Sequence, residues 1–140
     1  MALGARAELM PAHGIERTPG VVSFARSGDG QFWVDAQVDG QRVRFLVDTG
    51  ASDVVLSSTD AERLGYNLDR LSFNLEADTA NGRIREAPVV LGQLSIGSIH
   101  FEHVRASISA GGLRDSLLGM RLLERLSSVE IRRDMLTIRE

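Results

Sequence analysis

Cysteine and lysine are both absent from this chain of 140 residues. Without cysteine the chain has no disulfide bond, no thiolate nucleophile and no zinc–thiolate site. Without lysine it has no Schiff-base chemistry and no phosphate-loop lysine, and all 16 basic residues are Arg. A catalyst built from this sequence must therefore use Asp, Glu, His, Ser, Thr, Tyr or a metal held by oxygen ligands.

Long hydrophobic runs and stripes of positive charge are missing as well. The longest apolar stretches have only a few residues, far fewer than a membrane span needs. The net charge is −3, and the absence of a basic stripe argues against nucleic acid as a partner. The first ten residues lack the apolar core of a signal peptide. Two alternatives stay open: a cytosolic protein, or a chain preceded by an export or anchor segment.

Short apolar stretches alternate with turn dipeptides from Val21 onward. Asp29-Gly30, Asp39-Gly40 and Asn81-Gly82 supply the positive φ angles that two-residue hairpins require. We therefore predict antiparallel strands over Val21–Arg26, Gln31–Val38, Arg42–Val47, Phe73–Thr79, Arg83–Val90, two strands joined near Gly97-Ser98, and a last hairpin of Val129–Arg132 and Leu136–Arg139. Pro88 indicates an edge position or a bulge.

Two segments have helical patterns. Thr59–Glu62 has the spacing of a capping box and Arg63–Gly65 gives a stop, which predicts a short helix. Leu117–Leu126 places leucines at helical spacing and predicts a second helix. Residues 1–19 hold several Gly and Pro and show no periodicity, so we expect a flexible arm or linker before a domain of residues 20–140.

The most informative segment is Phe45–Ser52, in which three apolar residues lead directly into Asp48-Thr49-Gly50-Ala51-Ser52. A carboxylate between apolar stretches is costly unless it is hydrogen-bonded. Gly50 allows a sharp turn that points backbone N–H groups at Asp48, and the Thr49 hydroxyl can brace that turn. The alternative is an ordinary β-turn without chemistry.

The segment Leu46–Ala51 resembles the hallmark of the retropepsin-like (retroviral-type) aspartic proteases, namely two apolar residues and Asp-Thr-Gly-Ala at the end of a strand. Leu117-Leu118-Gly119, followed by Met120–Leu126, is similar to the family's apolar-apolar-Gly run before a helix. Thr79–Gly82 lies where a flap hairpin is expected. The resemblance covers about residues 21–140. It implies a mostly β, closed or partly open barrel of one lobe, with one or two short helices, that forms a twofold homodimer.

The resemblance also implies an activity. Asp48 would be the catalytic residue of an aspartic endopeptidase acting on proteins or peptides, supported by Thr49, Gly50 and Ala51. The sequence has one Asp-Thr-Gly, so the second carboxylate of the pair would come from a second copy of the chain. No metal and no cofactor would be needed.

Further parts of the site follow from the same resemblance. Ala80, Asn81 and Gly82 would form the flap over the substrate, Thr49 of each subunit would brace the other, and Leu136–Glu140 would contribute to the dimer interface. Some bacterial proteins of this type are anchored in a membrane with the protease domain outside the cytoplasm, and this chain would then be the soluble part. The flap lacks both the aromatic residue of pepsin-like enzymes and the glycine run of retroviral ones, so substrate preference does not carry over.

Other readings of the sequence compete with the peptidase. One is a non-catalytic module with the same fold that dimerises or binds peptides, because fold does not determine function. Another is a regulatory domain of a larger enzyme. A metal site at His100 and His103 is disfavoured, because residues three apart on a strand point to opposite faces.

Overall fold

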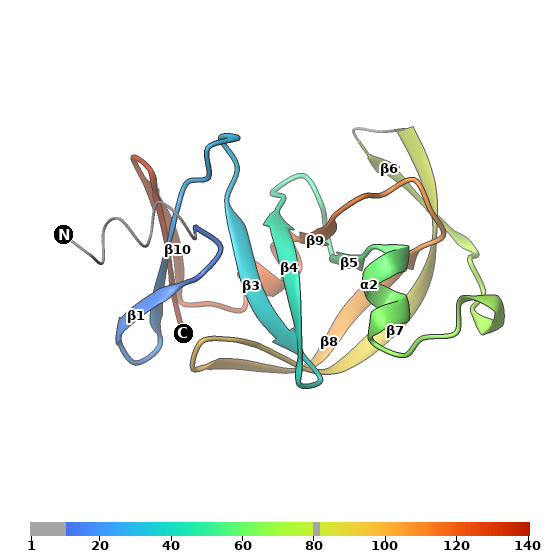
Figure 1. The fold of residues 1–140 in the computed structure, drawn as a ribbon, viewed down its shortest axis with the longest axis horizontal. Coiled ribbons are helices and arrows are strands. Elements are labelled where there is room, and N and C mark those ends of the chain that lie inside the picture. Colours follow the sequence, from blue (N-terminus) through green and yellow to red (C-terminus); the bar gives the residue numbers. More distant parts are fainter. Residues whose placement is uncertain (1–10, 80–81) are drawn as a thin grey trace.

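The computed structural model describes residues 11–79 and 82–140. Among these residues the helical segments are short and the strands dominate (Figure 1). The helices are α2 (Ser58–Arg63), the 3-10 helix η1 (Leu68–Arg70) and α3 (Met120–Leu123). The strands are β1 (Ile15–Thr18), β2 (Val21–Ala25), β3 (Trp33–Val38), β4 (Gln41–Val47), β5 (Val54–Leu56), β6 (Leu75–Thr79), β7 (Gly82–Ile96), β8 (Ile99–Ser109), β9 (Ser116–Leu118), β10 (Ser128–Arg132) and β11 (Met135–Arg139).

The larger sheet closes on itself. Its strand order is β3-β4-β9-β5-β8-β7-β6, and β3 also pairs with β7 through Gln37 with Ser95 and Val38 with Leu94. The pairing of β3 with β7 makes a ring of six strands, while β6 extends outward from β7. The fold is thus the mostly β, barrel-like single lobe that the sequence predicted.

The smaller sheet has the strand order β1-β2-β11-β10 and lies at the end of the molecule where the C-terminus is drawn (Figure 1). Its strand pairs are all antiparallel. β11 is an inner strand, and the outer strands are β1 and β10. The Glu140 N–H donates to the Gly20 carbonyl at 2.9 Å, which ties the end of the chain to the turn between β1 and β2.

The alternation of the sequence matches burial in the structure. Val34, Ala36 and Val38 of β3 are buried, as are Val43 and Phe45 of β4. The β3–β4 hairpin turns at Asp39 and Gly40, whose φ angles are +48° and +86°, as a two-residue turn of this type requires. The prediction for this hairpin is confirmed.

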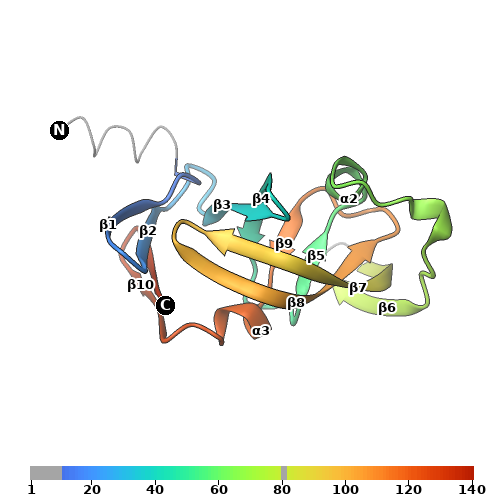
Figure 2. The ribbon, with the colours of Figure 1, turned by 90° about the horizontal axis from the view of Figure 1, so that it is seen from below.

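The longest hairpin, β7–β8, runs along much of the molecule (Figure 2). Its register extends from Glu86 opposite Ser109 to Ile96 opposite Ile99. The sequence predicted two separate strands over residues 83–96, and the structure joins them into one. Pro88 lies between the part of β7 that pairs with β6 and the part that pairs with β3, which confirms the predicted edge position.

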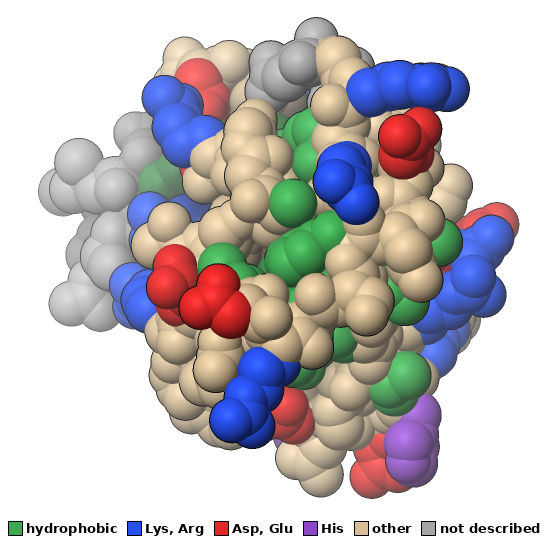
Figure 3. Space-filling model, turned by 90° about the vertical axis from the view of Figure 1, so that its right-hand side faces the viewer, with side chains coloured by type: hydrophobic (Ala, Val, Ile, Leu, Met, Phe, Trp, Pro, Cys, Tyr) green, Lys and Arg blue, Asp and Glu red, His purple; other side chains and the backbone are tan. Residues whose placement is uncertain are grey.

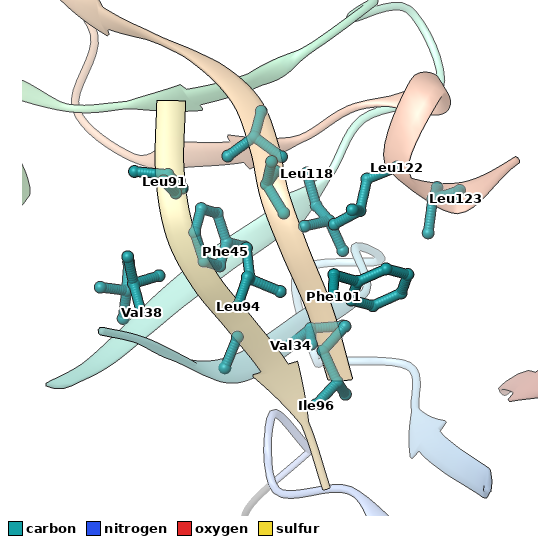
Figure 4. Packing of buried hydrophobic residues seen from close by; sticks show 14 of the residues in the cluster. Val34, Val38, Phe45, Leu91, Leu94, Ile96, Phe101, Leu118, Leu122 and Leu123 are labelled. Atoms are coloured by element: carbon teal, nitrogen blue, oxygen red, sulfur yellow. The ribbon is translucent and has the colours of Figure 1, made fainter. Parts of the chain in front are cut away.

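The core fills the ring of strands. Figure 4 shows Phe45 of β4 and Leu118 of β9 among leucine, valine and phenylalanine side chains from β3, β7, β8 and α3. Phe45 and Leu118 are almost completely buried. Burial of each such side chain contributes about 1.5–3 kcal/mol to folding. The strand β4, from whose end Asp48 follows, is therefore anchored in the hydrophobic core.

Three local predictions are wrong. Asp29-Gly30 does not join paired strands, because β2 pairs with β1 and β11 while β3 pairs with β4 and β7. The first helix is capped by Ser57, whose hydroxyl accepts from the Asp60 N–H, and not by Thr59. Leu117 and Leu118 belong to β9, and the second helix begins only at Met120.

The expected irregular arm is partly ordered. Ile15–Thr18 form β1, which pairs with β2, and Ala12 is buried. The first ten residues lie outside the described part of the chain. The domain boundary at residue 20 stays a prediction.

The surface at the α2 and β6 end of the molecule is mixed in character. Figure 3 shows hydrophobic side chains reaching the surface in a hollow, with Asp, Glu and Arg side chains around it. Leu64, Tyr66 and Leu68, from the segment around η1, are partly buried against the core.

Within residues 11–79 and 82–140, no helix has the length and apolar character needed to cross a membrane.

Candidate active site

Asp48 follows directly after β4, where the chain leaves the barrel. Its N–H donates to the Leu118 carbonyl at 3.1 Å, which continues the parallel pairing of β4 with β9. The Gly50 N–H donates to Asp48 Oδ1 at 2.9 Å, and the Ala51 N–H donates to the Asp48 carbonyl at 3.1 Å. A Cβ atom on Gly50 would lie 3.2 Å from Asp48 Oδ1 and would crowd it. The Asp-Thr-Gly turn thus presents a backbone donor to the carboxylate, as predicted from Gly50.

The loop after Asp48 rests on the start of α3. The N–H groups of Met120 and Arg121 donate to the carbonyls of Ala51 and Ser52, each at 2.9 Å. A Cβ atom on Gly119 would lie only 2.2 Å from the Asp53 carbonyl oxygen. The glycine of the apolar-apolar-Gly run is therefore needed at this point so that the loop can pack against the helix.

A cleft of about 580 Å³ opens beside Asp48. Its lining includes Gly50 and Ala51 from the loop and one face of the larger sheet as its floor. The strand register explains this floor, because directly opposed residues, and residues two apart on one strand, share a face. Val55 of β5 lies opposite Leu117 of β9 and Ser107 of β8, and Leu75 of β6 lies opposite Glu86 of β7. Glu86 lies opposite Ser109, two residues from Ser107 on β8, so these residues share one face, and Leu117, Val55, Ser107, Glu86 and Leu75 all line the cleft.

Glu86 stands out because it is a carboxyl group in this otherwise uncharged floor. The residue is only 7% exposed. Burial raises the pKa of the Glu86 carboxyl, the nearby charge of Asp53 adds to the rise, and a hydrogen bond from the Ser107 hydroxyl opposes it. Neither Glu86 nor Ser107 was predicted from the sequence. The signal available was a carboxylate two residues after Ile84 on a predicted strand, which places it on the same face as a buried residue.

Apart from Asp48 and Glu86, the carboxylates of the cleft have arginine partners outside its lining. Asp53 pairs with Arg121 at 3.2 Å and with Arg105 at 3.7 Å. On β6, Glu76 and Asp78 each lie 3.3 Å from the Arg83 guanidinium.

The predicted flap is only partly described. The β6–β7 hairpin is present, with Thr79 opposite Gly82. Ala80 and Asn81 lie outside the described residues. The hairpin extends from the cleft wall, since Leu75 and Ala77 of β6 line the cleft.

Thr49 is exposed, and its hydroxyl makes no hydrogen bond to any residue that the structure describes. It does not brace its own turn, in contrast to the expectation from the sequence. Its exposure leaves the hydroxyl accessible to a second chain.

A buried polar network supports the site from behind. The Ser116 hydroxyl donates to Asp60 Oδ2 at 2.6 Å and accepts from the Ser57 N–H at 3.0 Å. This network joins the start of α2 to β9, the strand beside Asp48. In the described ranges, no three His, Asp or Glu side chains come together in a way that could hold a metal ion.

Comparisons with known proteins agree with this geometry. The family model described as gag-polyprotein putative aspartyl protease matches residues 34–125. A protein of unknown function from Rickettsia prowazekii is 39% identical over 93% of this chain and 56% of its own length. A Sinorhizobium protein encoded in the cobV 5′ region is 42% identical over 80% of this chain and 48% of its own length. The chain thus spans about half the length of these two relatives.

Solved structures show the same fold. A retropepsin-like aspartic protease from Rickettsia conorii superposes with a TM-score of 0.78 at 39% identity, covering 85% of this chain and 89% of that one. The EIAV protease, complexed with the inhibitor HBY-793, superposes with a TM-score of 0.60 at 18% identity, covering 73% and 93%. With an Asp-Thr-Gly turn at the end of a barrel strand and relatives of this kind, the chain belongs to the retropepsin-like aspartic protease family.

Proposed function

We propose that this chain is an aspartic endopeptidase that works as a homodimer, with one Asp48 from each subunit. The observation that carries the proposal is Asp48 itself, held by the Gly50 N–H at the mouth of a cleft large enough for peptide side chains. Two carboxylates that share one proton can activate a water molecule, one acting as base and the other as acid. The attack of that water on the peptide carbonyl would cleave the bond.

The need for a second chain follows from the number of carboxylates. The sequence contains a single Asp-Thr-Gly, so a twofold axis beside Asp48 is the simplest source of the second group. The exposure of Thr49, next to Asp48, supports contact with a partner at this point.

The smaller sheet supplies a second candidate contact surface. The backbone of β11 is already paired on both sides, so Leu136–Glu140 cannot add a strand to the partner's sheet. Strand β10 is an outer strand, and Val129 and Ile131 on it are exposed apolar residues. In the proposed dimer, β10 contributes to the interface in place of Leu136–Glu140, the segment for which the resemblance implied that role.

The test is peptide cleavage by the wild-type chain and by Asp48→Asn, measured on a mixed peptide library. The amide can neither share a proton nor act as a general base, so we expect a loss of at least about 10³-fold in turnover while folding is retained. Circular dichroism and a melting curve check that the variant is folded.

The opposite outcomes are equally informative. Turnover that persists in purified Asp48→Asn would remove Asp48 from the catalytic role. Peptide binding by the wild type without any cleavage would favour the non-catalytic dimerisation or peptide-binding module.

A further inference from the structure

The floor of the cleft holds a buried carboxyl group without a cation. Glu86 is 7% exposed, whereas the side chains of Asp53, Glu76 and Asp78 are 20%, 58% and 85% exposed. Those three carboxylates each have an arginine partner. Among the residues that the structure describes, no arginine forms an ion pair with Glu86. An ionised carboxylate in such surroundings gains most from a cation that enters the cleft.

Within the part of the chain that the structure describes, no cation competes for this position. The cleft lining in the described ranges contains carboxylates, small residues and apolar residues but no arginine. The Arg83 guanidinium pairs with Glu76 and Asp78 on the rim, and Arg105 and Arg121 are held by Asp53.

The neighbours of Glu86 fit a side chain that has an apolar stem and a charged head. Leu75 lies directly opposite Glu86 on β6, with Ala77 two residues further along, and both line the cleft. Val55 continues the apolar floor beyond Ser107. Apolar walls around one carboxylate are complementary to the methylene groups and cationic end of Arg or Lys. A purely apolar side chain would leave the carboxylate unpaired, and an acidic one would be repelled.

We propose that Glu86, positioned by Ser107, is a specificity residue that binds the guanidinium or ammonium group of an Arg or Lys side chain in the peptide substrate. This inference rests on the proposed peptidase function of the same cleft. A site with a buried charged residue distinguishes strongly between a substrate that carries the opposite charge and one that lacks it. The reason is that the neutral substrate leaves the buried residue desolvated and unpaired. The enzyme should therefore prefer peptides with a basic side chain at one defined position near the cleaved bond.

The experiment uses internally quenched peptides derived from a sequence that the wild type cleaves. Arg is placed in turn at each position and compared with citrulline, which has nearly the same shape but no charge. At one position we expect kcat/KM to be about tenfold or more higher for Arg than for citrulline. In Glu86→Gln that ratio should fall to near one. In the matched control Glu76→Gln, which removes a solvent-exposed charge on the rim of the same cleft, the ratio should change less than about twofold.

Folding and charge are checked separately. Glu86→Asp keeps the charge on a shorter stem and should keep a preference for Arg. Because burial raises the pKa of Glu86, Glu86→Gln should be at least as stable as the wild type near neutral pH, and a marked loss of stability there would show that Glu86 serves the fold instead. An unchanged ratio in folded Glu86→Gln, or a wild type with no Arg preference at any position, would overturn the proposal while leaving the peptidase function intact.

A measurement of peptide binding tests the role of Glu86 independently of the proposed peptidase activity. The folded Asp48→Asn protein should bind the Arg peptide about tenfold more tightly than the citrulline peptide in calorimetry. If the wild type cleaves no peptide, the proposed function fails, and the same binding comparison still decides whether Glu86 selects a cation. Equal affinities for the two peptides would overturn the subsite.

Discussion

Gly119 shows how one missing side chain shapes the candidate site. The first turn of α3 donates two N–H groups to the loop that follows Asp48, and this contact brings the backbone of residue 119 close to the Asp53 carbonyl. The backbone of Gly119 has an ordinary φ of −93°. Glycine is required here for space and not for an unusual backbone angle.

A methyl group at this position should therefore be damaging. We expect Gly119→Ala to lower the free energy of unfolding by about 1–3 kcal/mol, since the loop must shift to relieve the clash. A displacement of about 1 Å at Asp48 can lower turnover about 100-fold. Urea unfolding and peptide cleavage measure the two effects.

The chain offers a matched control for this substitution. A Cβ atom on Gly28 would meet nothing within 4 Å, so Gly28→Ala should change stability by less than about 0.5 kcal/mol. Equal stability of the Gly119→Ala and Gly28→Ala proteins would contradict the seating of the loop on α3.

Strands and helices were predictable where neighbouring residues decide them. Asp39-Gly40 alone specifies a tight hairpin, and the alternation of β3 follows from residues two apart. Leu117 and Leu118 have helical spacing with later leucines, but pairing with β4 and β5 makes them a strand. Asp29-Gly30 has the chemistry of a hairpin turn, but β11, more than 100 residues away, pairs with β2 instead. Local patterns do not reveal such distant partners.

Glu16 connects two such distant elements. Its carboxylate accepts from the N–H groups of Gly20, in the β1–β2 turn, and of Ser98, in the β7–β8 turn, at 2.8 and 3.0 Å, and also from the Ser98 hydroxyl. These hydrogen bonds, with that from the Ser98 hydroxyl first, hold the pKa of Glu16 below its ordinary value. The smaller sheet is thereby fastened to the end of the barrel.

A lowered pKa in the folded state means that the carboxylate stabilises the fold above the pKa of the unfolded chain. That contribution is lost as the pH falls through the folded pKa. We expect Glu16→Gln to have a lower urea midpoint than the wild type at pH 7, because the amide nitrogen cannot accept a hydrogen bond. The difference should shrink below about pH 4.

The exposed Glu102 provides the control for charge alone. It forms no ion pair within the described part of the chain, so Glu102→Gln should leave the urea midpoint close to that of the wild type at both pH values. A Glu16→Gln midpoint that differs from the wild type by the same amount at pH 7 and pH 3 would show that the carboxylate charge is not involved.

At the scale of the whole molecule, the parts of the cleft differ in how far they could be predicted. Asp48 and Gly119 belong to short motifs whose order along the chain indicated that they meet. Glu86 joins them only through the register of β7 against β6 and β8. Alternation tells which residues share a face of one strand but not which residues of other strands lie beside them. The proposed catalytic group was therefore predictable, and the proposed specificity residue was not.

The proposed dimer makes a quantitative prediction about mixtures of chains. When wild type and Asp48→Asn are mixed at a constant total concentration and subunits exchange freely, homodimers of wild type form in proportion to the square of the wild-type fraction. A mixed dimer has one carboxylate in place of the pair and should be nearly inactive. At equal amounts of the two chains we therefore expect about one quarter of the full activity. Replacing Asp48→Asn by an inert carrier protein tests dilution alone, and the concentration is kept where light scattering finds dimers. A straight-line dependence on the wild-type fraction, reaching one half at equal amounts, would mean that each chain acts alone and that the second carboxylate comes from within the same subunit.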